Sequence, residues 1–75
     1  MNNQRRKEIA TALELMQKAL DILEPTQSDE QKAYENMPES LQNSERGEIS
    51  QTWCDVLDNV VNNLQGDIDA LGSVE

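Results

Sequence analysis

The fold is decided by residues 36–48, which read NMPESLQNSERGE and separate two segments with helical apolar periodicity. Pro38 opposes a continuous helix here, because it fixes its own backbone and restricts the residue before it. Ser44 then offers an N-terminal cap, and Glu45 places negative charge in the following first turn, where the helix dipole favours it. These signals predict a chain reversal over residues 37–44 and therefore an all-α antiparallel helical hairpin.

The segment after the reversal predicts one long helix over about residues 45–71. Its apolar residues fall in two rows with helical spacing. One row is Ile49, Trp53, Val56 and Val60, and the other is Leu57, Val61, Leu64, Ile68 and Leu71. The second row advances in alternating steps of four and three residues, which is the pattern of a coiled-coil seam.

The segment before the reversal predicts a helix over about residues 5–24. Its seam is formed by Ile9, Leu13, Met16, Leu20 and Leu23, with Ala12, Leu15, Ala19 and Ile22 in a second row. Pro25 predicts that this helix either kinks or stops. In the second case a short helix restarts over about residues 28–36, where Ser28 and Gln31 fit a capping box.

Two apolar rows on each helix exceed what a two-helix seam covers, and this predicts self-association. A single domain of 75 residues is also too small to be stabilised well by one core. We therefore expect residues 1–75 to pair into a four-helix bundle or a similar coiled-coil-like oligomer, with a dimer favoured. The expected oligomer core is Leu13, Met16, Leu20, Leu23, Trp53, Val56, Leu57, Val60, Val61, Leu64 and Ile68.

The residue types that carry most enzyme chemistry are missing from the sequence. It has no His, and Cys54 is its one cysteine, so an internal disulfide and a zinc site both lack partners. Neither a glycine-rich phosphate loop nor a serine nucleophile motif is present. We expect a protein that is not an enzyme and that holds no cofactor or metal.

The charge of the chain is strongly negative and unevenly distributed. Fifteen acidic residues oppose six basic ones, and Arg5, Arg6 and Lys7 supply half of the positive charge. An acidic field of this kind repels DNA, RNA and anionic membranes and attracts basic protein surfaces. Solubility is the competing interpretation. Because no apolar run resembles a signal peptide or a membrane-spanning helix, we expect a cytoplasmic protein.

The stretch around the reversal also resembles a known group of proteins. Residues 29–48 read DEQKAYENMPESLQNSERGE, and the chain opens with Arg5-Arg6-Lys7. This combination resembles small acidic helical-hairpin proteins encoded by bacteriophages and prophages, which carry such a basic start and such a loop. Pro25 departs from the unbroken first helix of that group. The resemblance implies a phage origin, and hence the host cytoplasm, but it implies no biochemical activity.

Our leading functional hypothesis is a non-enzymatic phage accessory protein that binds and inhibits or modulates a host protein with a basic surface. A defence component is one candidate target, and acidic mimicry of DNA is one candidate mechanism. The alternatives are a structural helper that tethers other phage proteins, and a sponge for a nucleotide signal that uses the basic residues. The predicted partner-binding residues are Met37, Glu39, Leu41, Glu45, Arg46 and Glu48. In the competing interpretation, Met37 and Leu41 only close the end of the core.

Overall fold

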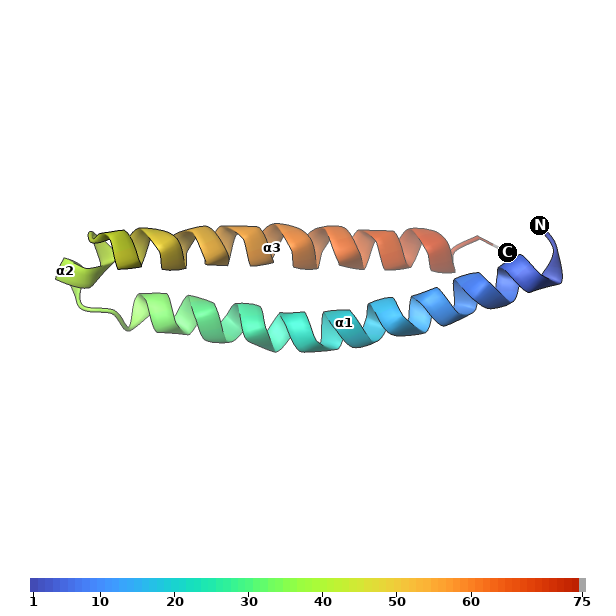
Figure 1. Cartoon of the computed structure of the whole chain (residues 1–75), viewed down its shortest axis with the longest axis horizontal. Helices are drawn as coiled ribbons and strands as arrows, with labels where there is room; N and C mark the ends of the chain where they lie inside the picture. Colours follow the sequence, from blue (N-terminus) through green and yellow to red (C-terminus); the bar gives the residue numbers. More distant parts are fainter. Residues whose placement is uncertain (75) are drawn as a thin grey trace.

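Two long helices account for most of the chain in the computed structural model, which describes residues 1–74. Helix α1 (Asn3–Glu35) and helix α3 (Glu45–Gly72) run antiparallel, and the connection between them contains the one-turn helix α2 (Glu39–Gln42). The molecule is a rod of 57 × 16 × 14 Å with both termini at one end and α2 at the other (Figure 1). The predicted all-α hairpin, with its reversal over residues 37–44, is confirmed.

The two long helices begin at side-chain caps. The side chain of Asn2 accepts a 2.9 Å hydrogen bond from the backbone N–H of Arg5, so α1 starts two residues earlier than predicted. Ser44 caps α3 as predicted, and its hydroxyl accepts a hydrogen bond from the backbone N–H of Gly47. The boundaries of α3 therefore agree with the sequence to within one residue.

Pro25 does not interrupt the first helix. Helix α1 is continuous from Asn3 to Glu35, so the predicted stop near residue 24 and restart near residue 28 are wrong. Ser28 lies inside the helix, and Gln31 donates to Glu35 instead of closing a capping box. Pro25 is exposed, and the helix bows gently with its convex side away from α3 (Figure 1). One lost backbone hydrogen bond on the solvent side costs less than a break in the packing against α3.

The hairpin is held by one seam in which both helices repeat in steps of three and four residues. Burial and spacing together identify the seam residues of α1 as Ile9, Leu13, Met16, Leu20, Leu23, Gln27, Glu30 and Tyr34, with Met37 just beyond the helix. Ala19, which precedes Leu20, is also half-buried. The seam residues of α3 are Gly47, Ser50, Cys54, Leu57, Val61, Leu64 and Ile68. Leu20 is fully buried, whereas most of the other seam side chains are half-buried. The core of a single hairpin is therefore thin.

The predicted core residues divide into two groups in this hairpin. Eight of them lie in the seam: Leu13, Met16, Leu20, Leu23, Leu57, Val61, Leu64 and Ile68. The other three lie outside it, since Trp53 is 55% exposed, Val56 45% and Val60 41%. In the half of α3 next to the loop, the seam is formed instead by the small side chains of Ser50 and Cys54 and by Gly47.

Candidate protein-binding surface

The loop end of the hairpin is a packed structure. Helix α2 rests on the first turn of α3, where Gly47 is buried so closely that an added Cβ atom would overlap the backbone carbonyl oxygens of Leu41 and Gln42. The Gln42 side chain donates a 3.0 Å hydrogen bond to the backbone carbonyl of Tyr34, which fastens α2 to the end of α1. The Ser44 hydroxyl donates to the carbonyl of Leu41. The residues on this loop are therefore held in fixed positions.

The six predicted partner-binding residues all lie at this end of the rod. Met37 is half-buried at the end of the seam, whereas Leu41 on α2 is 40% exposed. The remaining four are exposed: Glu39, Glu45, Arg46 and Glu48. Met37 thus closes the end of the core, and Leu41 contributes an apolar group to a surface rich in carboxylates.

The seam divides the rest of the surface into two sides. Successive residues of a helix are rotated by about 100°, so the residues just before and just after a seam residue flank it on opposite sides. Helix α3 runs in the opposite direction to α1, which exchanges the two sides of its seam. It is also turned to face α1, which exchanges them back. Residues that precede seam residues therefore lie on the same side of the hairpin in both helices, and residues that follow them lie on the other side.

One side of the hairpin is formed by the residues that come just before seam residues in the sequence. It carries large exposed apolar residues, which we call the apolar stripe. Its members are Leu15, Ile22, Ile49, Trp53, Val56 and Val60, which are between 41% and 66% exposed. Hydrogen bonds from Gln27 to Asp58 and from Ser50 to Glu30 set the register of the helices and place Ile22 level with Val60. The stripe therefore starts on α1 near the termini, crosses at this level, and continues on α3 toward the loop.

The opposite side carries an acidic face. It comprises Glu14, Asp21, Glu24, Glu35, Glu48, Asp55, Asp58 and Asp69, all of which are exposed. Within residues 1–74, Lys7 is the one basic residue on this side. The side with the apolar stripe holds Glu8, Asp29 and Asp67 together with Arg5 and Arg46, so it is nearly neutral. The negative charge of the chain is thus concentrated on one long face of the rod.

Glutamine side chains position half of the acidic face. Amide groups of Gln17, Gln31 and Gln65 donate hydrogen bonds of 3.0–3.1 Å to Asp21, Glu35 and Asp69, each one helical turn further on. Gln27 donates to Asp58 across the seam at 2.8 Å. These donors are neutral, so they orient the carboxylates without reducing the negative charge that a partner would meet.

Cys54 lies in the seam and is 7% exposed. Burial raises the pKa of its thiol, and the nearby carboxylates of Glu30, Asp55 and Glu35 raise it further. Both effects disfavour the thiolate, which is the reactive form of cysteine. Cys54 therefore acts as a small packing residue between the helices.

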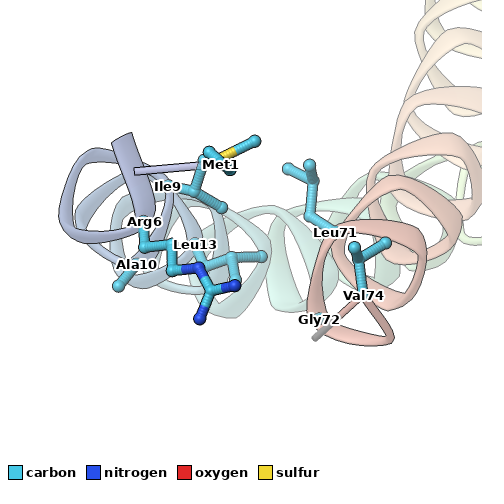
Figure 2. Close-up of a pocket in the computed structure, with 8 residues that line it drawn as sticks. All are labelled: Met1, Arg6, Ile9, Ala10, Leu13, Leu71, Gly72 and Val74. Atoms are coloured by element: carbon cyan, nitrogen blue, oxygen red, sulfur yellow. The ribbon is translucent and has the colours of Figure 1, made fainter. Parts of the chain in front are cut away.

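A hollow of about 520 Å³ opens between the two helices at the end that carries the termini. It is lined by Met1, Arg6, Ile9, Ala10 and Leu13 on one side and by Leu71, Gly72 and Val74 on the other. Figure 2 shows Leu71 and Val74 facing Ile9 and Leu13 across the gap, with the Arg6 side chain at its edge. The lining is mostly apolar.

The basic residues invoked for a nucleotide sponge are not brought together within one hairpin. Arg5, Arg6 and Lys7 belong to the first turns of α1, whereas Arg46 belongs to the first turn of α3 at the opposite end of the rod. A phosphate group would meet Arg6 alone in the lining of the hollow. A single hairpin therefore offers no cluster of cations at this site.

The two sides of the hairpin are encoded in the sequence but were not predicted from it. The two sides can be identified once Gly47, Ser50 and Cys54 are assigned to the seam. These three residues continue the steps of three and four residues from Leu57 back toward the loop. Their small and polar side chains gave no apolar signal. In this half of α3 the apolar pattern is carried instead by the neighbouring row of larger residues, which lies outside the seam of the single hairpin.

Residues 1–74 contain no group of three or more Cys, Asp or Glu side chains placed to hold one metal ion. Neither long helix, over the same residues, has an apolar stretch that would cross a bilayer. Comparisons with protein-family models, with curated proteins and with solved structures gave no match.

Proposed function

We propose that this chain is a non-enzymatic, phage-encoded accessory protein that acts in the host cytoplasm by binding a basic surface of a host protein. The observation that carries the proposal is the concentration of eight carboxylates against one lysine on the acidic face. Charge gathered on one side gives a directed field, which speeds the encounter with a basic partner and orients it. Acidity that served solubility alone would not need to be gathered on one face.

The loop adds the specific part of the proposed contact. Leu41 offers a partly exposed apolar group next to the carboxylates of Glu39 and Glu45, and the packed loop holds all three in place. An apolar anchor within a charged rim is the usual composition of a protein-binding site. Glu48 belongs both to the loop region and to the acidic face, so one partner can contact the two surfaces together.

The rod shape suits mimicry of DNA as the mode of binding. Carboxylates occur on both helices along the length of the acidic face, and amide hydrogen bonds orient four of them. A DNA-binding protein recognises regularly placed negative charge through its lysines and arginines. A host defence component that contacts nucleic acid is therefore the class of target that we propose.

The proposal is tested by recovering a partner from host lysate and then measuring its affinity in purified form at low and physiological salt. The test variant is Glu14→Gln with Asp55→Asn, and the matched control is Thr11→Lys with Asn59→Lys on the outer edges of the helices. Both pairs change the net charge by the same amount. We expect the test variant to lose about tenfold in affinity, with an effect that shrinks as salt rises, and the control to lose much less.

Equal losses for the two variants would mean that net charge alone matters, and the acidic face would then not be the contact. Recovery of a phage structural protein would favour the alternative function, a helper that tethers other phage proteins. That alternative is supported by the exposed apolar stripe, which suits a helical docking partner.

A further inference from the structure

A single hairpin exposes more surface than its mass predicts. The accessible surface is 5750 Å², whereas a compact monomer of 8.5 kDa exposes about 4,700 Å². The surplus of about 1,000 Å² is similar to the roughly 800 Å² that one partner buries in a standard protein interface. The apolar residues that are buried within residues 1–74 are Leu20 and Cys54. The hairpin thus has the surface of a subunit that lacks its neighbour.

Much of the apolar part of this surplus lies in the apolar stripe. Ile22 is 66% exposed, Leu15 61%, Trp53 55% and Ile49 54%. With Val56 and Val60, these side chains expose on the order of 600 Å², as much as the largest apolar patch on a typical monomer. Two stripes pressed together would bury about 1,200 Å², which reaches the range of stable, specific interfaces.

The distribution of charge indicates which molecule can cover the side with the apolar stripe. Two copies of a chain with a net charge of −9 repel each other in most orientations. The side with the stripe is the exception, because its Arg5 and Arg46 nearly balance Glu8, Asp29 and Asp67. A second copy can therefore approach through the stripe with little repulsion, while the acidic faces of both copies stay in water on the outside of the pair.

We propose that the stripe is the contact between two copies of this chain, which pair around a two-fold axis into a four-helix bundle. A two-fold contact requires the same patch on both subunits, and the stripe passes through the middle of the rod, where Ile22 and Val60 lie level. Half-buried seam residues such as Leu23 and Leu57 also gain cover in the bundle. This inference does not rest on the proposed function.

The charges at the two ends select the orientation of the pair. At the end with the termini, Arg5, Arg6 and Lys7 balance Glu8, Asp67 and Asp69, whereas at the loop end Arg46 alone opposes Glu35, Glu39, Glu45 and Glu48. Hairpins with their loops at opposite ends place the nearly neutral end of each copy over the acidic loop of the other. Hairpins with their loops together place the two acidic loops side by side, which costs energy. The opposite arrangement follows.

The mass of the full chain in solution is the first test, and Trp53 is a built-in reporter for the second. Sedimentation at micromolar concentration should give twice the 8.5 kDa of one chain. The emission of Trp53 should be blue-shifted at high concentration and should move to the red on dilution, because the pair separates and wets the indole. A mass of 8.5 kDa for the helical chain, or an emission of Trp53 that is already that of a solvent-exposed indole in the dimer, would overturn the proposal.

Ile22→Glu tests the surface itself, because it puts one carboxylate from each copy near the two-fold axis. We expect its dissociation constant to rise at least a hundredfold. The matched control is Gln51→Glu, which adds the same charge on the opposite, exposed side and should leave the dimer unchanged. A dimer that tolerates Ile22→Glu, or that loses as much affinity with Gln51→Glu, would contradict pairing through the stripe.

The orientation is tested by a spin label at Asn3→Cys in a Cys54→Ala background. Loops at opposite ends place the two labels of a dimer far apart, at a separation approaching the 57 Å length of the rod. Loops at the same end would give a separation on the order of 20 Å, the width of a helix bundle. The short distance would overturn the proposed orientation, and this readout does not require the dissociated hairpin to stay folded.

Discussion

The side-chain amide of Gln27 on α1 donates a 2.8 Å hydrogen bond to the carboxylate of Asp58 on α3, across 31 positions of the chain. Three residues further along α1, Glu30 accepts a bond of the same length from the hydroxyl of Ser50. Both contacts belong to the half of the seam near the loop, where apolar side chains are scarce. Polar pairs of this kind contribute modestly to stability, but they distinguish one register of the helices from its neighbours.

The tight contact at Gly47 leads to the first prediction. Gly47→Ala should destabilise the protein by roughly 1–3 kcal/mol, because the added methyl group would overlap the backbone carbonyl oxygens of Leu41 and Gln42 and displace α2. Gly66→Ala is the matched control, since no atom outside its own helical backbone lies within 4 Å of its added Cβ. It should stabilise α3 by up to about 1 kcal/mol. Chemical denaturation at one fixed protein concentration measures both. Similar effects of the two substitutions would contradict this account of the loop.

The seam shows which parts of the fold were predictable from the sequence. Leu57, Val61 and Leu64 were assigned correctly because large apolar residues at steps of three and four leave a clear pattern. Ser50 and Cys54 occupy equivalent positions in the seam and are buried, but the apolar pattern did not predict them. Their side chains are small, so they fill the seam while contributing little apolar area. The hairpin, its reversal and the Ser44 cap followed from local signals, whereas the composition of the seam near the loop depends on a tertiary contact.

The local effect of Pro25 predicts a kink or a stop in the first helix, but tertiary packing keeps α1 continuous. A proline removes one hydrogen bond from a helix, but both flanking segments of α1 pack on the same continuous α3. Pro25→Ala should therefore stabilise the protein by roughly 1–3 kcal/mol. The upper limit is the full difference in helix propensity between proline and alanine in a helix interior.

Thermal and chemical unfolding of Pro25→Ala would measure this gain. Lys18→Ala serves as its control, because Lys18 is also exposed and lies seven residues earlier on the same outer edge of α1. This control should change stability by less than about 0.5 kcal/mol. A loss of stability in Pro25→Ala would show that the bow in α1 is required by the packing and is not merely tolerated.

Cys54 should make the stability of the fold depend on pH in the alkaline range. Its pKa is raised above the ordinary value of 9.0, mainly by burial, so the folded state holds the thiol proton more tightly than the unfolded chain. This contribution is fully present below pH 9 and is lost as the pH rises through the higher pKa of the folded state. Stability measured from pH 8 to pH 11 should fall more steeply for the wild type than for Cys54→Ala. Parallel curves would show that the thiol is not buried in solution.

The last prediction separates partner binding from packing at the loop. Glu39→Lys with Glu45→Lys should weaken the proposed partner complex by about tenfold or more, because two attractive contacts become repulsive. Both side chains are exposed, so the effect on thermal stability should be limited to their interactions with the helix dipoles, about 0.5 kcal/mol each. Gln4→Lys, Thr11→Lys, Asn59→Lys and Ala70→Lys together make the same change in net charge on the outer edges of the helices, away from the loop, and should leave most of the affinity intact.

Leu41→Ala completes the comparison, with Leu71→Ala as its control. The two leucines are 40% and 39% exposed and lie at opposite ends of the hairpin, so each substitution should lower stability by a similar amount, on the order of 1 kcal/mol. If Leu41 also anchors a partner, Leu41→Ala alone should reduce the affinity under conditions in which both variants are fully folded. Equal affinities for the two variants would mean that Leu41 only covers the end of the core. Intact binding by the double lysine variant at physiological salt would remove the loop from the proposed contact and leave the acidic face as the surface to test.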